Sequence, residues 1–296
     1  MKMLNGLVIA GWSAALLAGC SGGSGDVAVP QGTLSLSVTD APVADATEVW
    51  VQFSGVELQS STHGRQFFDF SEQPKRIELL ALEGGGSEWL LEEELLPAGK
   101  YEWIRLMVDA EPGVSDTYLV TATGEHELTV PSGDQTGLKL NRGFVVPAGG
   151  RTDFTIDFDL RKSLVLDAQG YKLRPTLRLI DNSEVGAVAG QVDVAALCPS
   201  EIGVAIYVFP DRDTQPEDIN IDQNQGPLVA APVRFQEDEG NYCYRAAFLP
   251  AGDYTLALTC QADQDDPASD EDLEFVGQQN AVVEVGQTIP VHFPPE

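Results

Sequence analysis

The sequence contains little positive charge. Its 296 residues include 17 Lys and Arg against 46 Asp and Glu, and the formal net charge is −29. Recognition of nucleic-acid phosphates or of an anionic membrane depends on a basic surface, so this composition argues against either as the main partner. It favours cations or cationic partners, although proteins from saline habitats carry similarly acidic surfaces because salt screens their self-repulsion.

Residues that commonly build catalytic sites are also scarce. The three histidines, His63, His126 and His292, are scattered, and no nucleophile motif, nucleotide-binding loop or paired metal-ligand spacing accompanies them. We therefore predict a protein that is not an enzyme and has no cofactor. The alternative from a different class is a hydrolase that works with carboxylates alone.

Long apolar runs are absent except at the N-terminus. Lys2 precedes an apolar run from Leu7 to Ala18, which is shorter than the roughly 20 residues of a membrane-spanning helix but suits a cleaved signal peptide. Residues 1–19 are therefore not expected to belong to the fold.

The apolar run ends in Leu17-Ala18-Gly19-Cys20, followed by a Gly- and Ser-rich stretch at 21–25. This pattern resembles the lipobox of bacterial lipoproteins, which implies that Cys20 begins the mature chain and is acylated with fatty acids such as palmitate. Several acyl chains hold a protein durably on a bilayer. Ser21, in place of Asp, implies the Gram-negative outer membrane, on its periplasmic or its surface face. Residues 20–31 would then form a flexible tether. The acyl chains on Cys20 would make outer-membrane lipid a partner of the protein.

Alternation with a period of two dominates the sequence from Gly32 onward. Leu34, Leu36 and Val38 alternate with small polar residues, which predicts a half-buried strand, and residues 49–53 repeat the pattern. The stretches 77–82 and 89–96 suit a helical turn as well as a strand. In 101–108 the apolar positions change from odd to even numbers, as a β-bulge would cause.

Two later stretches, 154–160 and 171–179, are predicted to pair antiparallel. This pairing would place Asp157 and Asp159 on the same outer face as Lys172, Arg174 and Arg178. The basic residues of this region either pair with those acids or face lipid phosphates or another acidic partner. The candidates for an anionic partner are Arg161, Lys162, Lys172 and Arg174.

Several separated motifs in residues 32–182 are similar to one family. They are Thr39-Asp40-Ala41-Pro42, Val49-Trp50-Val51, Leu96-Pro97-Ala98-Gly99-Lys100-Tyr101 and Arg161-Lys162-Ser163-Leu164. Together they resemble an uncharacterised bacterial lipoprotein family with a domain of unknown function, DUF 4382. The resemblance implies a β-rich extracytoplasmic domain on a lipid anchor and supplies no catalytic residue.

Residues 183–296 are interpreted as a second, more acidic domain. From Glu184 to Glu296 there are 21 acidic residues, three Arg and no Lys. Residues 241–254 resemble the strand, Pro-Gly corner and Tyr strand of carboxypeptidase-regulatory-like or transthyretin-like (prealbumin-like) sandwiches. Leu-Pro-Ala-Gly-Asp-Tyr at 249–254 also repeats Leu-Pro-Ala-Gly-Lys-Tyr at 96–101. The two domains are either related sandwiches, which we favour, or share one common β-corner.

Three cysteines of the second domain, Cys198, Cys243 and Cys260, lie in a compartment where disulfides persist. A simple hairpin about the Pro250 corner would bring Cys243 to Cys260, whereas strands on opposite sheets would favour Cys198 with Cys260. Loop-closure entropies of about 3 and about 4 kcal/mol do not decide between them. We favour Cys198–Cys260, because the corner in the sandwiches that it resembles need not be a tight hairpin.

Two acidic loops could supply the six to eight oxygen ligands that Ca²⁺ prefers. One spans residues 211–222, and the other contains Asp263, Asp265, Asp266 and Asp270. No Asp-x-Asp-x-Asp-Gly frame with a terminal Glu is present. We therefore take solvated loops as the first interpretation and Ca²⁺ binding as the second.

The chain is thus predicted to be mainly β, with two β-sandwich domains in tandem and at most one or two short helices. We expect a non-enzymatic lipoprotein of the Gram-negative cell envelope that presents these domains for binding, adhesion or a structural role. A Ca²⁺-dependent glycan-binding accessory protein is the alternative within the same class. The partner is expected to be a protein or a glycan and not a nucleic acid.

Overall fold

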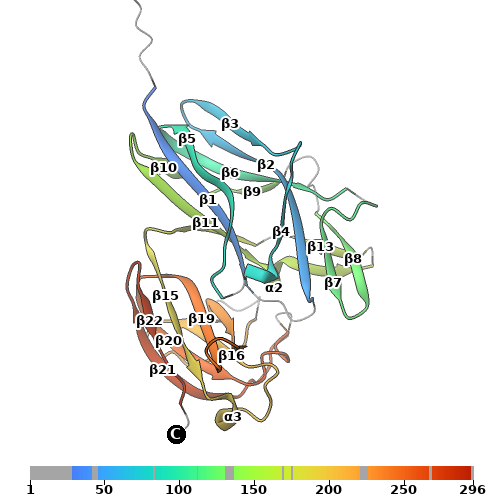
Figure 1. The fold of residues 1–296 in the computed structure, drawn as a ribbon, viewed down its shortest axis with the longest axis vertical. Helices are drawn as coiled ribbons and strands as arrows, with labels where there is room; N and C mark the ends of the chain where they lie inside the picture. The colour runs from blue at the N-terminus through green and yellow to red at the C-terminus, as the bar shows by residue number, and fades with distance from the viewer. Residues whose placement is uncertain are drawn as a thin grey trace, which may run out of the picture.

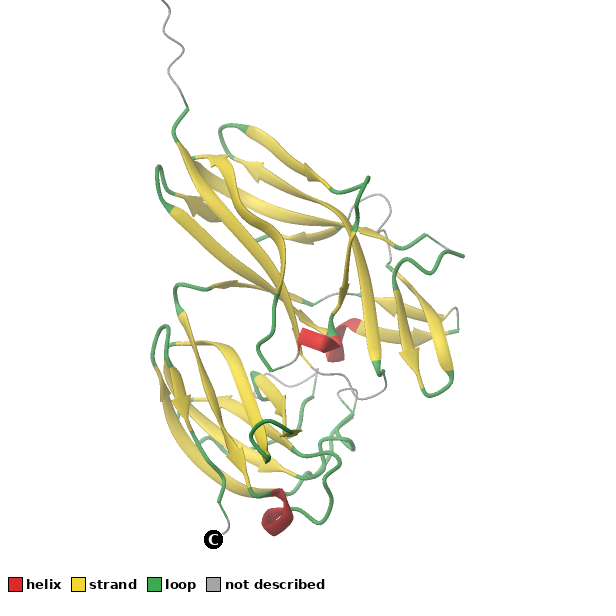
Figure 2. Cartoon of the chain, in the orientation of Figure 1, coloured by secondary structure: helices red, strands yellow, loops and turns green. Residues whose placement is uncertain are grey.

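The computed structural model describes residues 29–41, 46–82, 84–111, 113–130, 137–168, 170–174, 176–220, 226–266 and 269–294. Over these ranges the chain forms two β-sandwiches stacked end to end (Figure 1). Helices are confined there to α2 (Leu160–Ser163), α3 (Val194–Leu197) and the 3-10 turn η1 (Leu80–Leu82), as Figure 2 shows. The predicted fold class, mainly β with short helices, is confirmed. Cys20 and the expected signal peptide lie outside the described residues.

The first sandwich packs a four-stranded sheet against a ten-stranded one. The smaller sheet has the order β14-β11-β1-β5, and the larger has the order β10-β6-β2-β7-β8-β13-β12, with β3 and β4 paired to β2 and β9 paired to β6. The strands are β1 (Gln31–Ala41), β2 (Glu48–Ser60), β3 (Gly64–Asp69), β4 (Lys75–Glu78), β5 (Glu88–Pro97), β6 (Gly99–Asp109), β7 (Tyr118–Thr121), β8 (Gly124–Thr129), β9 (Leu138–Leu140), β10 (Phe144–Val146), β11 (Arg151–Asp159), β12 (Leu164–Asp167), β13 (Gly170–Leu173) and β14 (Leu177–Asp181).

The second sandwich consists of two four-stranded sheets, β18-β19-β15-β22 and β17-β16-β20-β21. Its strands are β15 (Val185–Val192), β16 (Ala205–Pro210), β17 (Val229–Pro232), β18 (Arg234–Gln236), β19 (Asn241–Pro250), β20 (Gly252–Thr259), β21 (Phe275–Val283) and β22 (Thr288–Pro290). Within the described part of the chain, no helix is both long and apolar enough to cross a membrane.

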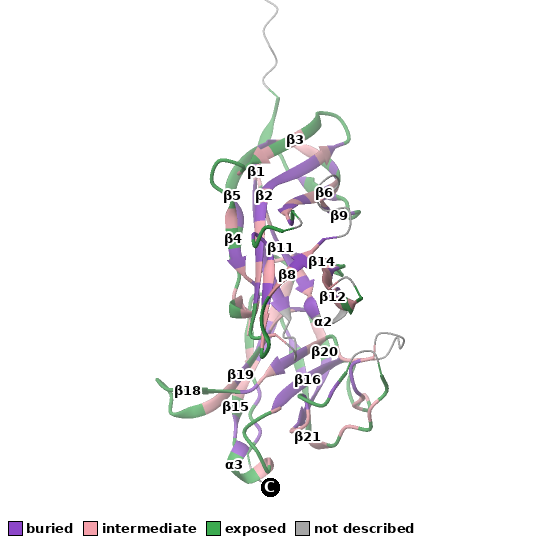
Figure 3. Ribbon diagram, turned by 90° about the vertical axis from the view of Figure 1, so that its right-hand side faces the viewer, coloured by how far each residue is buried: buried purple, intermediate pink, exposed green. Residues whose placement is uncertain are grey.

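Each sandwich has its own apolar core. Leu34, Leu36 and Val38 of β1 are fully buried and pack in one cluster with Val51 and Phe53 of β2, as the alternating pattern predicts. A second cluster fills the space between the sheets of the second sandwich. Buried residues follow the strands of both sandwiches (Figure 3).

Of the two stretches with ambiguous patterns, residues 77–82 contain the end of β4 and the 3-10 turn η1. Residues 89–96 belong to β5, whose pairing with β1 shifts register twice, and Glu93 has a positive φ of 51°. These bulges let both Leu90 and Leu91 be buried, so alternation is lost. In β6 the predicted bulge is confirmed, because the register shifts between the pairs Gln59–Trp103 and Ser60–Tyr101.

One predicted pairing is partly wrong. Strand β11 does pair antiparallel with β14, and Asp157 lies opposite Arg178. The turn after Asp167, however, closes a separate hairpin of β12 and β13, in which Lys172 forms an ion pair with Asp167. The close sequence spacing of these two residues favours a local hairpin over the longer connection to β11. Lys172 therefore does not lie opposite Asp157.

The two Leu-Pro-Ala-Gly-x-Tyr motifs adopt the same corner. Each joins a strand of one sheet to a strand of the opposite sheet, β5 to β6 and β19 to β20. The Tyr101 hydroxyl donates to the Pro97 carbonyl at 2.9 Å, and the Tyr254 hydroxyl donates to the Pro250 carbonyl at 2.8 Å.

The strands around the two corners are also connected alike. In each sandwich the strand before the corner pairs antiparallel with the first strand, β1 or β15, which pairs in parallel with a late strand, β11 or β22. The strand after the corner pairs with the second strand, β2 or β16. The shared arrangement supports the interpretation as related sandwiches.

The structure confirms the Cys198–Cys260 disulfide that was favoured from the sequence. Cys243 lies in β19 and Cys260 directly follows β20, so the corner places them on opposite sheets. Cys260 is instead bonded to Cys198, which follows α3, with 5.7 Å between their Cα atoms. The bond ties together the two sheets of the second sandwich.

Candidate functional site

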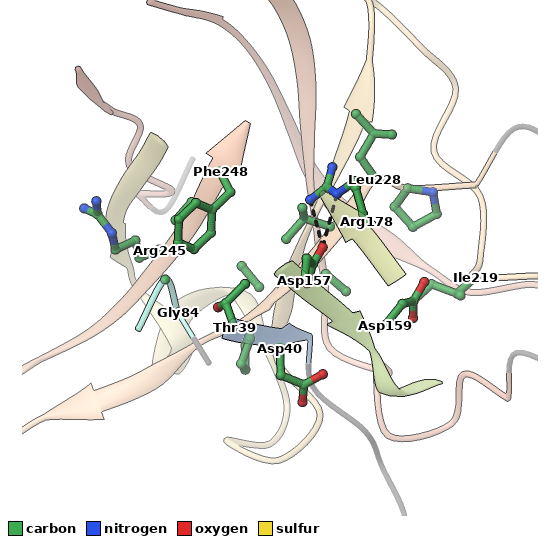
Figure 4. A pocket seen from close by; sticks show the side chains of 17 residues that line it. Thr39, Asp40, Gly84, Asp157, Asp159, Arg178, Ile219, Leu228, Arg245 and Phe248 are labelled. Atoms are coloured by element: carbon green, nitrogen blue, oxygen red, sulfur yellow. Dashed lines mark hydrogen bonds and ion pairs between the residues drawn. The ribbon is translucent and has the colours of Figure 1, made fainter. Parts of the chain in front are cut away.

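A small cavity lies between the two sandwiches (Figure 4). The first sandwich contributes Asp40 at the end of β1, Asp157 of β11 and Arg178 of β14, and the second contributes Phe248 of β19 and Leu228. Its volume is about 80 Å³, whereas pockets for small molecules usually measure roughly 300–1,000 Å³. The cavity has room for about two or three water molecules, at roughly 30 Å³ each, and does not have the size of a substrate cleft.

Arg178 is a charged residue that lines this cavity. Its Nε and Nη2 donate to Asp157 Oδ2 at 3.2 and 2.9 Å, and both side chains are partly buried. Burial raises the pKa of Tyr254 in the second sandwich, and the positive charge of Arg178 opposes that rise. Arg178 is thus held by an acid of its own sandwich, and its effect on the second sandwich is confined to the pKa of Tyr254 in the interactions described.

A glycine turn of the first sandwich contacts the second sandwich. Gly85 has a φ of +93°, and a Cβ placed on it would lie 2.5 Å from Cβ of Ala247 in β19. The neighbouring Gly86 carbonyl accepts a hydrogen bond from Thr39 Oγ1 at 2.7 Å. The Thr39-Asp40 motif therefore lies at the junction and holds the turn that contacts the second sandwich.

The acidic loops cover the outer face of the sheet β17-β16-β20-β21. They enclose a small apolar cluster that includes Tyr207 and Ile219. Asp265 is buried, accepts hydrogen bonds from the Tyr207 hydroxyl and the Ile219 amide, and has carboxylate oxygens within 4.8 Å of those of Asp218 and Glu271. The Glu271 amide donates to Asp218 at 2.8 Å.

These contacts fasten the acidic loops to the sheet. Of the four candidate Ca²⁺ ligands, the structure brings only Asp265 into this three-carboxylate group, while Asp263, Asp266 and Asp270 are exposed. Asp218 and Glu271 belong to the same two acidic loops, and their approach to Asp265 depends on how the loops fold. Binding of Ca²⁺ stays a prediction.

Cys243 has a free thiol beside a groove of about 500 Å³. Burial, together with the hydrogen bond to Glu239 and its negative charge, raises the pKa of this thiol to about 11. His292 lines the same groove, and its Nδ1 accepts a hydrogen bond from the Gln191 amide at 3.1 Å. A thiol with so high a pKa is a poor nucleophile near neutral pH.

The other two histidines lie in the first sandwich, away from this groove. His63 is exposed in the turn between β2 and β3, and His126 of β8 contacts the hydroxyls of Thr121 and Thr123. The structure therefore brings no two of the three histidines into one site.

Comparison with known proteins gives a family for the first sandwich. Residues 31–175 match the family model described as "Domain of unknown function (DUF4382)". They form a DUF4382 domain. The resemblance seen in the sequence motifs is thereby confirmed for this part of the chain. No curated protein sequence matches the chain.

Solved structures that are similar to the chain are remote. A leucine-rich repeat protein from Bacteroides thetaiotaomicron is 14% identical with a TM-score of 0.21; the match covers 90% of this chain but 26% of that one. The minor pilin GBS52 from Streptococcus agalactiae is 12% identical with a TM-score of 0.20, covering 88% and 94%. The fimbrial anchor protein Mfa2 from Porphyromonas gingivalis is 10% identical with a TM-score of 0.20, covering 84% and 83%. Similarity at this level carries no argument about function.

Of the basic candidates of the DUF4382 domain, the structure describes the side chains of Lys172 and Arg174. Lys172 is engaged by Asp167, and Arg174 is exposed after β13. The side chains of Arg161 and Lys162 lie outside the described part of the structure. Their role with an anionic partner stays a prediction.

Sequence reasoning missed another basic group on the outer face of the larger sheet of the DUF4382 domain. Three cations surround the ring of Trp103 in β6: Arg65 of β3, Arg105 of β6 and Lys139 of β9. Arg65 and Lys139 are far from Trp103 in the sequence, and only the sheet register brings them together. The sequence gave one signal of this basic group: Trp103 and Arg105 occupy alternate positions after the bulge and so share one face of β6.

Proposed function

We propose that the protein is a non-enzymatic lipoprotein of the cell envelope, acylated at Cys20, that presents its second sandwich at a distance from the membrane. The supporting observation is the direction of the chain. Strand β1 begins at the end of the DUF4382 domain that is far from the second sandwich, whose C-terminal strands lie at the opposite end of the molecule (Figure 1). An anchor preceding β1 therefore leaves the second sandwich outermost.

The junction between the sandwiches suits this role. The Gly84–Gly86 turn packs against Ala247 of the second sandwich, and the two domains form an elongated unit (Figure 3). The second sandwich then has its acidic loops and the groove beside Cys243 available to a protein or glycan partner. Its Pro250 corner, with the Tyr254 hydrogen bond, supports the proposed relation to carboxypeptidase-regulatory-like and transthyretin-like modules.

The proposed location is the Gram-negative outer membrane, on the grounds of Ser21. The test compares the wild-type chain with a Cys20→Ser variant by cell fractionation, followed by protease treatment of intact cells. We expect the wild type in the outer-membrane fraction and the variant displaced from it. Equal membrane association of the two chains would overturn the proposed anchor. Digestion in intact cells, or protection from it, then assigns the surface or the periplasmic face.

A further inference from the structure

The outer face of the larger sheet carries a concentrated positive charge around Trp103. The distances to the centroid of its ring are 4.7 Å from Lys139 Nζ, 4.8 Å from Arg105 Cζ and 6.0 Å from Arg65 Cζ. Each distance is within the range of a cation–π interaction. We name this surface the Trp103 face and define it as Arg65, Lys100, Trp103, Arg105 and Lys139.

Lys100 belongs to this face because of the bulge in β6. Tyr101 points into the core and is fully buried, so its neighbour Lys100 points outward. The extra residue Glu102 resets the alternation, and Trp103 and Arg105 then also point outward while Ile104 is buried. The bulge thus turns Lys100 and Trp103 to one side of the sheet.

The Trp103 face carries more positive charges than there are negative charges beside it. Glu57 accepts hydrogen bonds from Arg65 Nη1 at 3.0 Å and from Arg105 Nη1 at 2.8 Å. Lys139 is exposed and forms no ion pair with any residue that the structure describes, and the same holds for Lys100. Glu102 precedes Trp103 at the bulge and adds an acid to this part of β6. The four cations of the face are a large share of the 17 in the chain.

Exposed apolar side chains border the same face. Phe67 of β3 lies opposite Glu57 and is 56% exposed, and Val145 of β10 lies opposite Lys100 and is 61% exposed. Cations next to exposed aromatic and aliphatic side chains are typical of surfaces that rest on a membrane interface.

The Trp103 face lies at the end of the domain where the chain enters. The Ala98 amide donates to the Pro30 carbonyl at 2.7 Å, and the Ser61 amide donates to the Lys100 carbonyl at 2.9 Å. The ten residues from Cys20 to Pro30 can span at most about 35 Å at 3.3–3.6 Å per residue. An anchor at Cys20 therefore keeps this end of the domain close to the bilayer.

We propose that the Trp103 face docks the DUF4382 domain onto the phosphate headgroups of the membrane that holds Cys20. The inference rests on the proposed anchoring and adds a second contact with the membrane. The net charge of −29 repels an anionic surface at long range, but charges are screened beyond about 8 Å in physiological salt. At contact, the cations nearest the headgroups therefore decide the interaction. Because cations surround the Trp103 ring, phosphate suits this surface better than a sugar ring stacked on the indole.

The test uses the chain from residue 20 onward with Cys20→Ser, so that no acyl chain contributes. Binding is measured by vesicle flotation, with vesicles of phosphatidylcholine alone and of phosphatidylcholine with an equal part of phosphatidylglycerol. The test variant is Lys100→Gln with Lys139→Gln, because neither lysine forms an ion pair in the described structure. The matched control is Arg212→Gln with Arg234→Gln, which removes the same charge from exposed positions of the second sandwich. Circular dichroism verifies that all chains are folded.

We expect binding to the anionic vesicles only, a loss of about 25-fold in the test variant, at about fivefold per cation near a charged surface, and little change in the control. Absence of binding to anionic vesicles, or an equal loss in the control, would overturn the proposal. Binding to an acidic polysaccharide such as alginate, without binding to vesicles, would do so as well and would identify a glycan ligand. Because these chains carry no acyl group, a negative result leaves the proposed acylation of Cys20 standing.

Discussion

Removal of the Cys198–Cys260 bond should destabilise the second sandwich alone. The two residues are 62 positions apart, and a closed loop of that length lowers the entropy of the unfolded chain by the equivalent of about 4 kcal/mol. The bond also joins the end of α3 to the end of β20, and so holds the two sheets together. We therefore expect Cys198→Ala with Cys260→Ala to lower the free energy of unfolding by about 4 kcal/mol.

The distribution of tryptophan lets urea unfolding separate the two sandwiches. Of the four Trp residues, Trp12 lies in the expected signal peptide and the other three lie at positions 50–103, so that Trp fluorescence reports the DUF4382 domain, whereas far-UV circular dichroism reports both sandwiches. With a slope of about 2 kcal/mol per M, the double variant should shift the transition seen only by circular dichroism by about 2 M. Cys243→Ala, which removes the free thiol, is the control and should shift it by less than about 0.3 M. An unchanged midpoint in the double variant, or an equal shift in Trp fluorescence, would refute the reasoning.

Three further predictions concern the corner, the junction and the thiol. Tyr254→Phe removes one hydrogen bond and should lower the free energy of unfolding by about 1 kcal/mol in urea titrations; a stabilised variant would contradict this. Gly85→Ala should cost about 1–3 kcal/mol more by calorimetry than Gly84→Ala, because both have a positive φ but only a Cβ at 85 meets the second sandwich, and equal costs would argue against the contact. Since its pKa is raised to about 11, Cys243 should react with iodoacetamide at pH 8 about 100-fold more slowly than a thiol of pKa 9, and Glu239→Gln should accelerate the reaction; a fast wild-type reaction would refute the assigned environment.

Local patterns were sufficient to predict the strands that alternate regularly. Leu34, Leu36 and Val38 are buried as their spacing indicates, and the change of phase within residues 101–108 correctly indicates a bulge, which lies before Trp103 and not after it. In a strand every second side chain faces the core, and a bulge changes which positions these are within one strand. The same rule fails for residues 89–96, where two register shifts leave no constant phase.

The Trp103 face and the three-carboxylate group were harder to predict, because they depend on how strands and loops that are distant in sequence come together. Arg65, Trp103 and Lys139 meet only because β3, β2, β6 and β9 are neighbours in one sheet. The net charge of the chain also gave no sign of these basic residues, because it sums positive and negative charges wherever they lie on the surface. Likewise, Asp265 lies with Asp218 and Glu271 because two loops fold over the same sheet, which the spacing of acids along one loop does not reveal.

The most direct test of the proposed anchoring is mass spectrometry of the N-terminal peptide from the protein extracted out of membranes. The account predicts a mature chain that begins at Cys20, lacks residues 1–19 and carries a diacylglyceryl group on the Cys20 sulfur and a fatty acid on its amino group. A peptide that still contains residues 1–19, or an unmodified Cys20, would contradict it.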